Sequence, residues 1–96
     1  MRLVICNEEG GMMQVGVDGE FYSGLDGSSL ADDVHAVQWF GDHGWVEKKD
    51  LINGRMTANE EISSIADFQF AIDAWNAVHQ AEQDALLVEP EQSQEN

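Results

Sequence analysis

The segment IADFQFAIDAWNAVHQAEQDAL, residues 65–86, contains the strongest periodic pattern in the chain and decides its fold class. Its large side chains recur every three or four residues, so one helical face carries six of them: Ile65, Phe68, Ile72, Trp75, His79 and Leu86. A helix with such a stripe can lie across one face of a twisted β-sheet. Thr57 and Glu60 have the spacing of a capping box, and Ser64 and Asp67 form a looser version of it, so we expect this helix to begin between Ala58 and Ile65.

Short apolar or alternating runs before the helix indicate strands. There are five of them: Leu3–Cys6, Met13–Val17, Glu20–Tyr22, Val34–Phe40 and Trp45–Lys49. Asp18-Gly19 is a two-residue hairpin signal, and the glycine-bounded run 41–44 marks a second turn. We therefore expect an α+β fold, in which a small antiparallel β-meander of four to five strands packs against one long C-terminal helix.

The length of 96 residues is enough for one hydrophobic core, and 43% of the residues are hydrophobic, as in globular proteins. We expect a single domain over residues 1–87, followed by a disordered acidic tail at 88–96, which lacks periodicity. The apolar run Met1–Cys6 is too short for a signal-peptide core or a membrane span, so we expect the protein to stay inside a cell. Cys6, the single cysteine, is expected to be a small buried side chain within a strand.

The charge is strongly unbalanced, with 19 acidic residues against four basic ones and a net charge of −15. Such a chain repels nucleic acid phosphates and anionic membrane surfaces, so we expect neither direct nucleic acid binding nor membrane binding. All four basic residues lie before residue 56, while residues 56–96 contain nine acidic residues.

No grouping of residues supports catalysis, a cofactor or a metal ion. His35 and His43 lie near Asp32, Asp33 and Asp42, but their spacing matches no compact metal-binding motif. The adjacent carboxylate pairs are typical of solvated turns in a chain this acidic. His79 lies on the apolar face of the helix, where we expect it to be hydrogen-bonded at the margin of the core rather than to act as a base. We therefore expect a protein that is not an enzyme and binds no cofactor.

Two groups of residues are candidates for contact with a protein partner. The first, near the end of the second hairpin, is Trp39, Phe40 and Trp45; these side chains are good anchors if exposed, and otherwise cover the core beneath Trp75. The second is a helical face of small residues roughly opposite the apolar stripe: Phe70, Ala74, Ala77 and Ala81. This face is either solvent-exposed alanine of high helix propensity or a docking surface, which could also support a symmetric homo-oligomer.

The run ADDVHAVQW at residues 31–39, followed by GWVE at 44–47, NEEI at 59–62 and a helix with Phe68 and Trp75, resembles small proteins encoded in the tail gene modules of tailed bacteriophages. The resemblance covers about residues 30–80. It implies a minor structural component or assembly factor that binds a tail or tail-fibre protein. Such a protein is located in the host cytoplasm during assembly or in the virion tail.

An alternative function follows from the charge, because a small and very acidic protein can imitate nucleic acid and inhibit a host DNA-binding or defence protein. Mimicry needs carboxylates spaced along one face as phosphates are along DNA. On the predicted helix, Asp67 and Glu82 lie away from Asp73 and Asp84, so no single acidic stripe forms. We therefore rank mimicry second.

Overall fold

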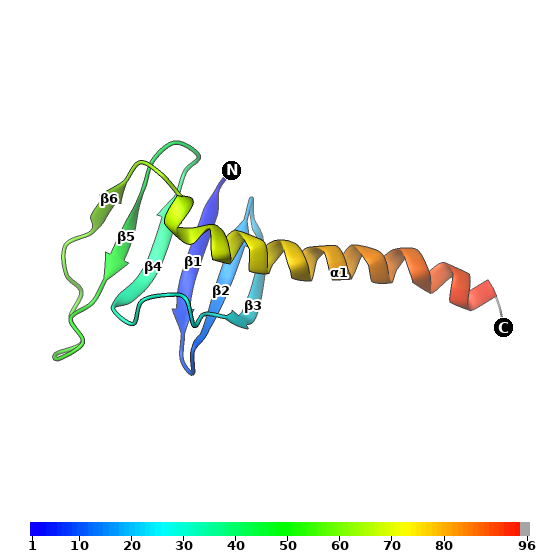
Figure 1. Cartoon of the computed structure of the whole chain (residues 1–96), viewed down its shortest axis with the longest axis horizontal. Coiled ribbons are helices and arrows are strands. Elements are labelled where there is room, and N and C mark those ends of the chain that lie inside the picture. Colours follow the sequence, from blue (N-terminus) through cyan, green and yellow to red (C-terminus); the bar gives the residue numbers. More distant parts are fainter. Residues whose placement is uncertain (95–96) are drawn as a thin grey trace.

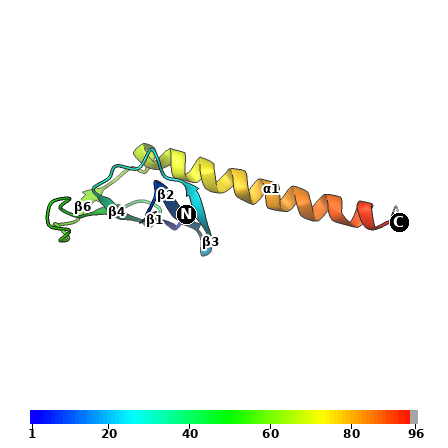
Figure 2. The same ribbon diagram turned by 90° about the horizontal axis from the view of Figure 1, so that it is seen from below.

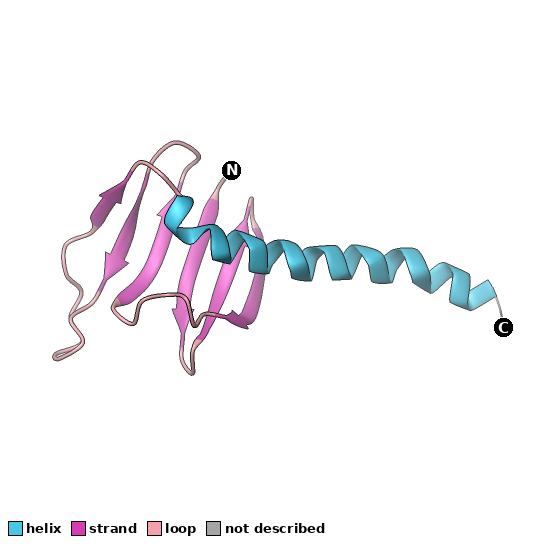
Figure 3. Cartoon of the chain, in the orientation of Figure 1, coloured by secondary structure: helices cyan, strands magenta, loops and turns pink. Residues whose placement is uncertain are grey.

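The computed structural model describes the backbone of residues 1–94 and the side chains of residues 1–86. Within these residues, a six-stranded antiparallel sheet packs against one long helix (Figures 1 and 3). The elements in chain order are β1 (Leu3–Glu8), β2 (Met12–Val17), β3 (Glu20–Asp26), β4 (Val34–Trp39), β5 (Gly44–Lys48), β6 (Glu60–Ile62), the 3₁₀ turn η1 (Ala66–Phe68) and α1 (Gln69–Gln94). The expected α+β fold is confirmed, with six strands instead of four or five.

The strand order is β3-β2-β1-β4-β5-β6, so β1 pairs with β2 on one side and with β4 on the other. The sheet therefore consists of two three-stranded meanders joined at β1 and β4, and not of one continuous meander. Residues 27–33 connect the edge strand β3 to β4, and they cross on the same side of the sheet as α1 (Figure 2). Leu30 anchors this crossover, because its side chain is buried in the core.

The core lies between α1 and one face of the sheet. Strand side chains alternate between faces, so Leu3 and Ile5 point towards the helix and are fully buried, while Val4 and Cys6 point to the opposite face. The pairing register places further buried side chains of the neighbouring strands on the helix side: Met13, Val15, Val37, Trp39 and Val46. The helix contributes Ala71 and Trp75. These side chains form one cluster, which is the main source of stability in a domain of this size.

The start of the helix differs from our prediction. Residues 60–62, which include the second residue of the predicted capping box, form strand β6 and pair with β5. The helical segment begins later, at Ala66, whose backbone N–H donates to Ser64 Oγ at 3.2 Å. The capping box predicted at Thr57–Glu60 is therefore wrong, because Glu60 pairs with β5. The looser signal at Ser64–Asp67 lies at the observed start of the helical segment.

The end of the helix falls within the stretch 88–96, where we expected a disordered acidic tail. Helix α1 continues to Gln94, while the side chains from residue 87 onward and all of residues 95–96 lie outside the described part of the chain. The expected character of the tail therefore stays a prediction.

Two glycines allow close approach within the sheet, and they provide a test of its packing. A Cβ on Gly44 would collide with the backbone of Gln38 and Trp39, while a Cβ on Gly16 would collide with the ring of Phe21. We expect Gly44→Ala to lower the free energy of unfolding by about 1 to 3 kcal/mol, because the backbone of β4 cannot move aside. Gly16→Ala should cost less, because the exposed Phe21 ring can rotate away. Urea unfolding followed by circular dichroism measures both, and equal stability of Gly44→Ala and the wild type would contradict the β4–β5 register.

Candidate interaction surfaces

The structure divides the predicted aromatic group of the second hairpin between the two faces of the sheet. Trp39 is only 5% exposed and lies in the core on the helix side, opposite Leu3 of β1. Trp45 pairs with Gln38 and therefore points to the opposite face. Phe40 follows the end of β4 and is 41% exposed. Of the three aromatic residues, Trp39 thus contributes to the core, and Phe40 and Trp45 remain candidates for an interface.

Phe40 is held in place by three neighbours, and we call these four residues the Phe40 anchor. The Arg2 guanidinium lies 4.1 Å from the centre of the Phe40 ring, the Trp45 ring lies at 5.1 Å, and the His43 ring stacks at 5.5 Å. These distances are typical of cation–π and aromatic pairs. The Phe40 backbone N–H donates to the His43 carbonyl at 2.8 Å, which closes the β4–β5 turn around the ring.

Hydrogen bonds also fix the two partners that flank the Phe40 ring. Arg2 Nη2 donates to Gln38 Oε1 at 2.6 Å, and Arg2 Nη1 donates to the carbonyls of Leu3 and Trp39 at 2.9 and 3.2 Å. Trp45 Nε1 donates to Glu47 Oε2 at 2.9 Å. The anchor is therefore preorganised, since little side-chain freedom remains to be lost when a partner covers it.

The Phe40 anchor lies at one side of a sheet face that α1 does not cover. Figure 2 shows α1 and the crossover on the same side of the sheet. One row of paired residues crosses this open face from β3 to β5: Phe21, Gly16, Val4, Gln38 and Trp45. Phe21 is exposed, and its ring rests on Gly16. The open face thus presents aromatic side chains and an arginine, residue types that are enriched in protein interfaces.

The predicted small-residue face of α1 is not uniform. Phe70 and Ala74, near the start of the helix, are partly buried and pack against the core, whereas Ala77 and Ala81 are exposed. Phe70 lines a hollow of about 270 Å³ between the start of α1 and the β5–β6 side of the sheet, together with Val46 and Ile62. The first half of this face therefore contributes to the fold, and only its second half is available to a partner.

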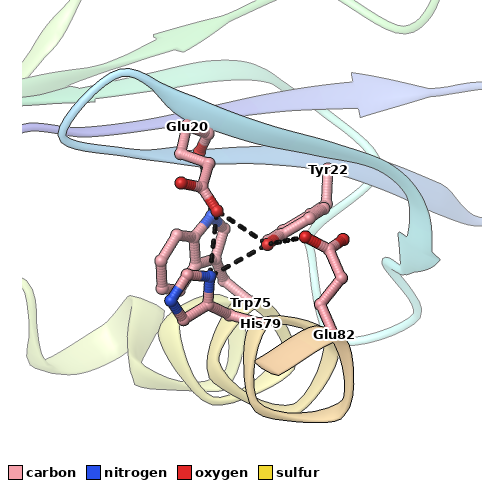
Figure 4. Close-up of polar contacts among 5 residues, drawn as sticks. All are labelled: Glu20, Tyr22, Trp75, His79 and Glu82. Carbon is pink, nitrogen blue, oxygen red and sulfur yellow. Dashed lines mark hydrogen bonds and ion pairs between the residues drawn. The ribbon is translucent and has the colours of Figure 1, made fainter. Parts of the chain in front are cut away.

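A polar cluster at the edge strand β3, which the sequence did not reveal, connects the helix to the sheet (Figure 4). The Tyr22 hydroxyl donates to Glu20 Oε2 at 2.8 Å and lies 2.9 Å from His79 Nδ1 and 3.3 Å from Glu82 Oε1. His79 Nδ1 is 2.9 Å from Glu20 Oε2. As expected from the sequence, His79 is hydrogen-bonded at the margin of the core.

Trp75 packs against this cluster and hydrogen-bonds to the edge strand. Its Nε1 donates to the backbone carbonyl of Glu20 at 2.9 Å, and its ring stacks on His79 with the centres 4.6 Å apart. The tryptophan thus buries its apolar body while its one donor is satisfied by the edge strand. The contact joins residues 55 positions apart in the sequence, so no local pattern could have indicated it.

The charges of the cluster are set by these contacts. The hydrogen bond from Tyr22 is the main cause that lowers the pKa of Glu20, and the hydrogen bond and charge of His79 add to it. Burial, followed by the hydrogen bond and negative charge of Glu20, raises the pKa of the Tyr22 hydroxyl. Glu20 therefore remains ionised and Tyr22 protonated near neutral pH. The polar groups satisfy one another, and the arrangement fastens α1 to β3.

Other titratable groups form no comparable site. Among residues 1–86, whose side chains the structure describes, no three His, Cys, Asp or Glu side chains converge in a way that could hold a metal ion. No helix in the described part of the chain has the length and apolar content to cross a membrane. His43 pairs with Asp42 at 2.6 Å on the surface. Cys6 is half-buried on the open face, and burial, with the charges of Glu47 and Glu8, raises the pKa of its thiol.

Comparisons with known proteins place the chain in no family. No profile of a protein family matches it, and neither a curated protein sequence nor a solved structure is significantly similar to it. Function is therefore argued from the surfaces described above.

Because of the Tyr22–Glu20 hydrogen bond, we expect the stability of the fold to depend on pH. Since the pKa of Glu20 is lowered in the folded state, this carboxylate stabilises the fold above the ordinary pKa of glutamate, and the contribution is lost as the pH falls through the lowered value. We expect Tyr22→Phe to raise the pKa of Glu20 towards its ordinary value, because the hydroxyl donor is gone. Carboxyl ¹³C NMR titration measures this pKa directly, with Glu47→Gln, outside the cluster, as the matched control. An unchanged Glu20 pKa in Tyr22→Phe would contradict the geometry in Figure 4.

Proposed function

We propose that the protein is a non-enzymatic, tail-associated protein of a tailed bacteriophage that binds a tail or tail-fibre protein, either as a minor structural component or as an assembly factor. The observation that carries the proposal is the open sheet face with its exposed and preorganised Phe40 anchor. The resemblance of residues 31–39 and the following segments to phage tail-module proteins supports the choice of partner.

The composition of the open face favours binding to a protein. A partner that covers Phe40 removes from water the 41% of this residue that is still exposed, which contributes a part of the about 1.5 to 3 kcal/mol for complete burial of such a side chain. The Arg2 guanidinium that stacks on the ring is already oriented by three hydrogen bonds, so its ordering costs little on binding.

The polar groups of the chain support a binding role over a catalytic one. The most connected cluster, at β3, contains a histidine, a tyrosine and two glutamates, but these groups are hydrogen-bonded to one another. A general base must instead reach the proton of a substrate. The cluster fixes the helix to the sheet, and this leaves the opposite face of the sheet open.

Affinity capture with a tagged protein tests the proposal. We expect wild-type protein to recover tail or tail-fibre proteins from phage-infected cells. The Phe40→Asp variant should recover at most about one tenth of that amount, because an aspartate cannot fill an apolar pocket. Ala77→Asp is the matched control, since it adds the same charge on the exposed side of α1. Circular dichroism confirms that all three proteins are folded. Presence of the protein in purified virions distinguishes a structural component from an assembly factor.

Two results would contradict the proposal. Recovery of a host DNA-binding or defence protein that is released by high salt would support nucleic acid mimicry instead. Equal loss of tail proteins with Phe40→Asp and Ala77→Asp, or loss with Ala77→Asp alone, would move the binding surface from the open face to the helix.

A further inference from the structure

A loop at one end of the molecule exposes apolar side chains that the fold does not use. We call this loop, residues 49–56, the Ile52 loop. It follows β5 and protrudes at the end of the sheet furthest from the C-terminal end of α1 (Figure 1). Ile52 is 97% exposed, and Leu51 and Met56 are also exposed. Exposed apolar groups in such number at a single loop indicate a contact site.

Hydrogen bonds within the Ile52 loop hold its backbone in one arrangement. Lys49 and Met56 form an antiparallel bridge, and the Asp50 backbone N–H donates to the Arg55 carbonyl at 2.8 Å. Asp50 Oδ1 accepts the backbone N–H of Ile52 at 2.7 Å, and Asn53 Oδ1 accepts that of Arg55 at 2.9 Å. The backbone that carries the apolar tip is therefore already ordered, which lowers the entropy cost of association.

The Ile52 loop has a net charge of +1, from Lys49 and Arg55 against Asp50, in contrast to the acidic rest of the chain. Lys49 and Arg55 belong to the loop, and Lys48 directly precedes it, so that three of the four basic residues of the protein lie in this region. Lys48 is paired with Glu60 at 3.0 Å. A surface that binds the loop should accordingly combine an apolar group with carboxylates.

The opposite end of the same molecule offers such a surface. Helix α1 passes the edge strand β3 and continues beyond the sheet (Figures 1 and 2). Leu86 follows Trp75 by eleven residues, about three turns, and therefore points to the same side of the helix. Trp75 is 8% exposed above the sheet, whereas Leu86, past the edge, is 60% exposed. The sheet-facing side of α1 thus continues where no strand lies beneath it.

Carboxylates flank this uncovered side of the helix. Glu82 lies one turn before Leu86, and Glu20 on β3 has a side chain that is 53% exposed. We call Glu20, Glu82 and Leu86 the overhang surface. It is complementary to the Ile52 loop in both respects, since each has an exposed apolar centre and the charges are opposite.

We propose that the Ile52 loop of one copy of this protein docks on the overhang surface of a second copy. The two surfaces lie towards opposite ends of a molecule 58 Å long, so one copy cannot satisfy both by itself. The contact joins different surfaces of the two copies and therefore propagates head to tail, closing into a ring or extending as a filament. This self-association does not depend on which protein binds the open face.

The net charge of −15 opposes the contact at low ionic strength. At about 0.15 M salt the screening length is about 8 Å, so repulsion between the distant parts of two copies is largely screened while adjacent charges still interact. A contact made by one loop and one helix end is small, so we expect weak association. It should be detectable when the protein concentration is raised to about 1 mM.

Sedimentation equilibrium of the purified full-length protein tests the proposal. We expect the average mass of the wild type to rise with concentration beyond that of a dimer, and Ile52→Asp and Leu86→Asp each to weaken association about tenfold or more. Ala77→Asp, with the same added charge on another side of α1, should associate like the wild type.

A mixture of the two variants gives the sharpest test. Ile52→Asp keeps an intact overhang surface and Leu86→Asp keeps an intact loop, so the mixture should form a 1:1 dimer and nothing larger. A wild type that stays monomeric over the whole range would overturn the proposal. The same holds for variants that associate as strongly as the wild type, or for a mixture that forms no dimer. None of these results depends on capture of a tail protein, so this contact and the proposed function can fail separately.

Discussion

Backbone pairing between β1 and β4 joins the two three-stranded halves of the sheet. The crossover at residues 27–33 and the packing of α1 on the sheet reinforce this connection. The register of this pairing sets Leu3 beside Trp39 and Ile5 beside Val37, all on the side that α1 covers. Because strand side chains alternate strictly, a slip of one residue would move a whole set of apolar side chains to the wrong face. The burial of these four side chains therefore specifies the register of β1 and β4 at the centre of the sheet.

The same alternation determines what the protein can present to a partner. Trp39 points into the core, and its partner in the register, Gly44, allows β4 and β5 to approach closely. The next residue, Trp45, therefore points to the open face. Phe40 lies just past the strand and is kept in position by Arg2 from the start of β1. Core packing on one face and the aromatic anchor on the other are thus consequences of one hydrogen-bonding pattern. The Tyr22–Glu20–His79 cluster keeps the helix on its own side.

Local patterns in the sequence predicted much of this fold. The helical stripe with Trp75 and His79, the Asp18-Gly19 turn and five of the six strands are short-range features, determined by side-chain periodicity and by turn residues. The features that the sequence did not predict depend on contacts between distant segments. Strand β6 is too short for a periodic pattern, and it forms because β5 offers an unpaired edge. The return of β4 to the side of β1 likewise depends on burial in three dimensions.

The candidate surfaces were predictable to a smaller extent. Phe40 and Trp45 were identified from their place in a hairpin, but only the register separates them from Trp39. The cluster around Tyr22 depends on a contact between residues 57 positions apart. The Ile52 loop depends on the solvent exposure of its apolar side chains, which cannot be inferred from residue type.

We propose that the open face of the sheet, and not the helix, contacts a phage tail or tail-fibre protein. A photoreactive amino acid placed at position 40, and in a separate variant at position 77, tests it most directly when the protein is irradiated in phage-infected cells and the cross-linked products are identified by mass spectrometry. We expect a cross-link from position 40 to a tail or tail-fibre protein and none from position 77. A tail protein cross-linked only from position 77, or no tail protein cross-linked from either position, would contradict it.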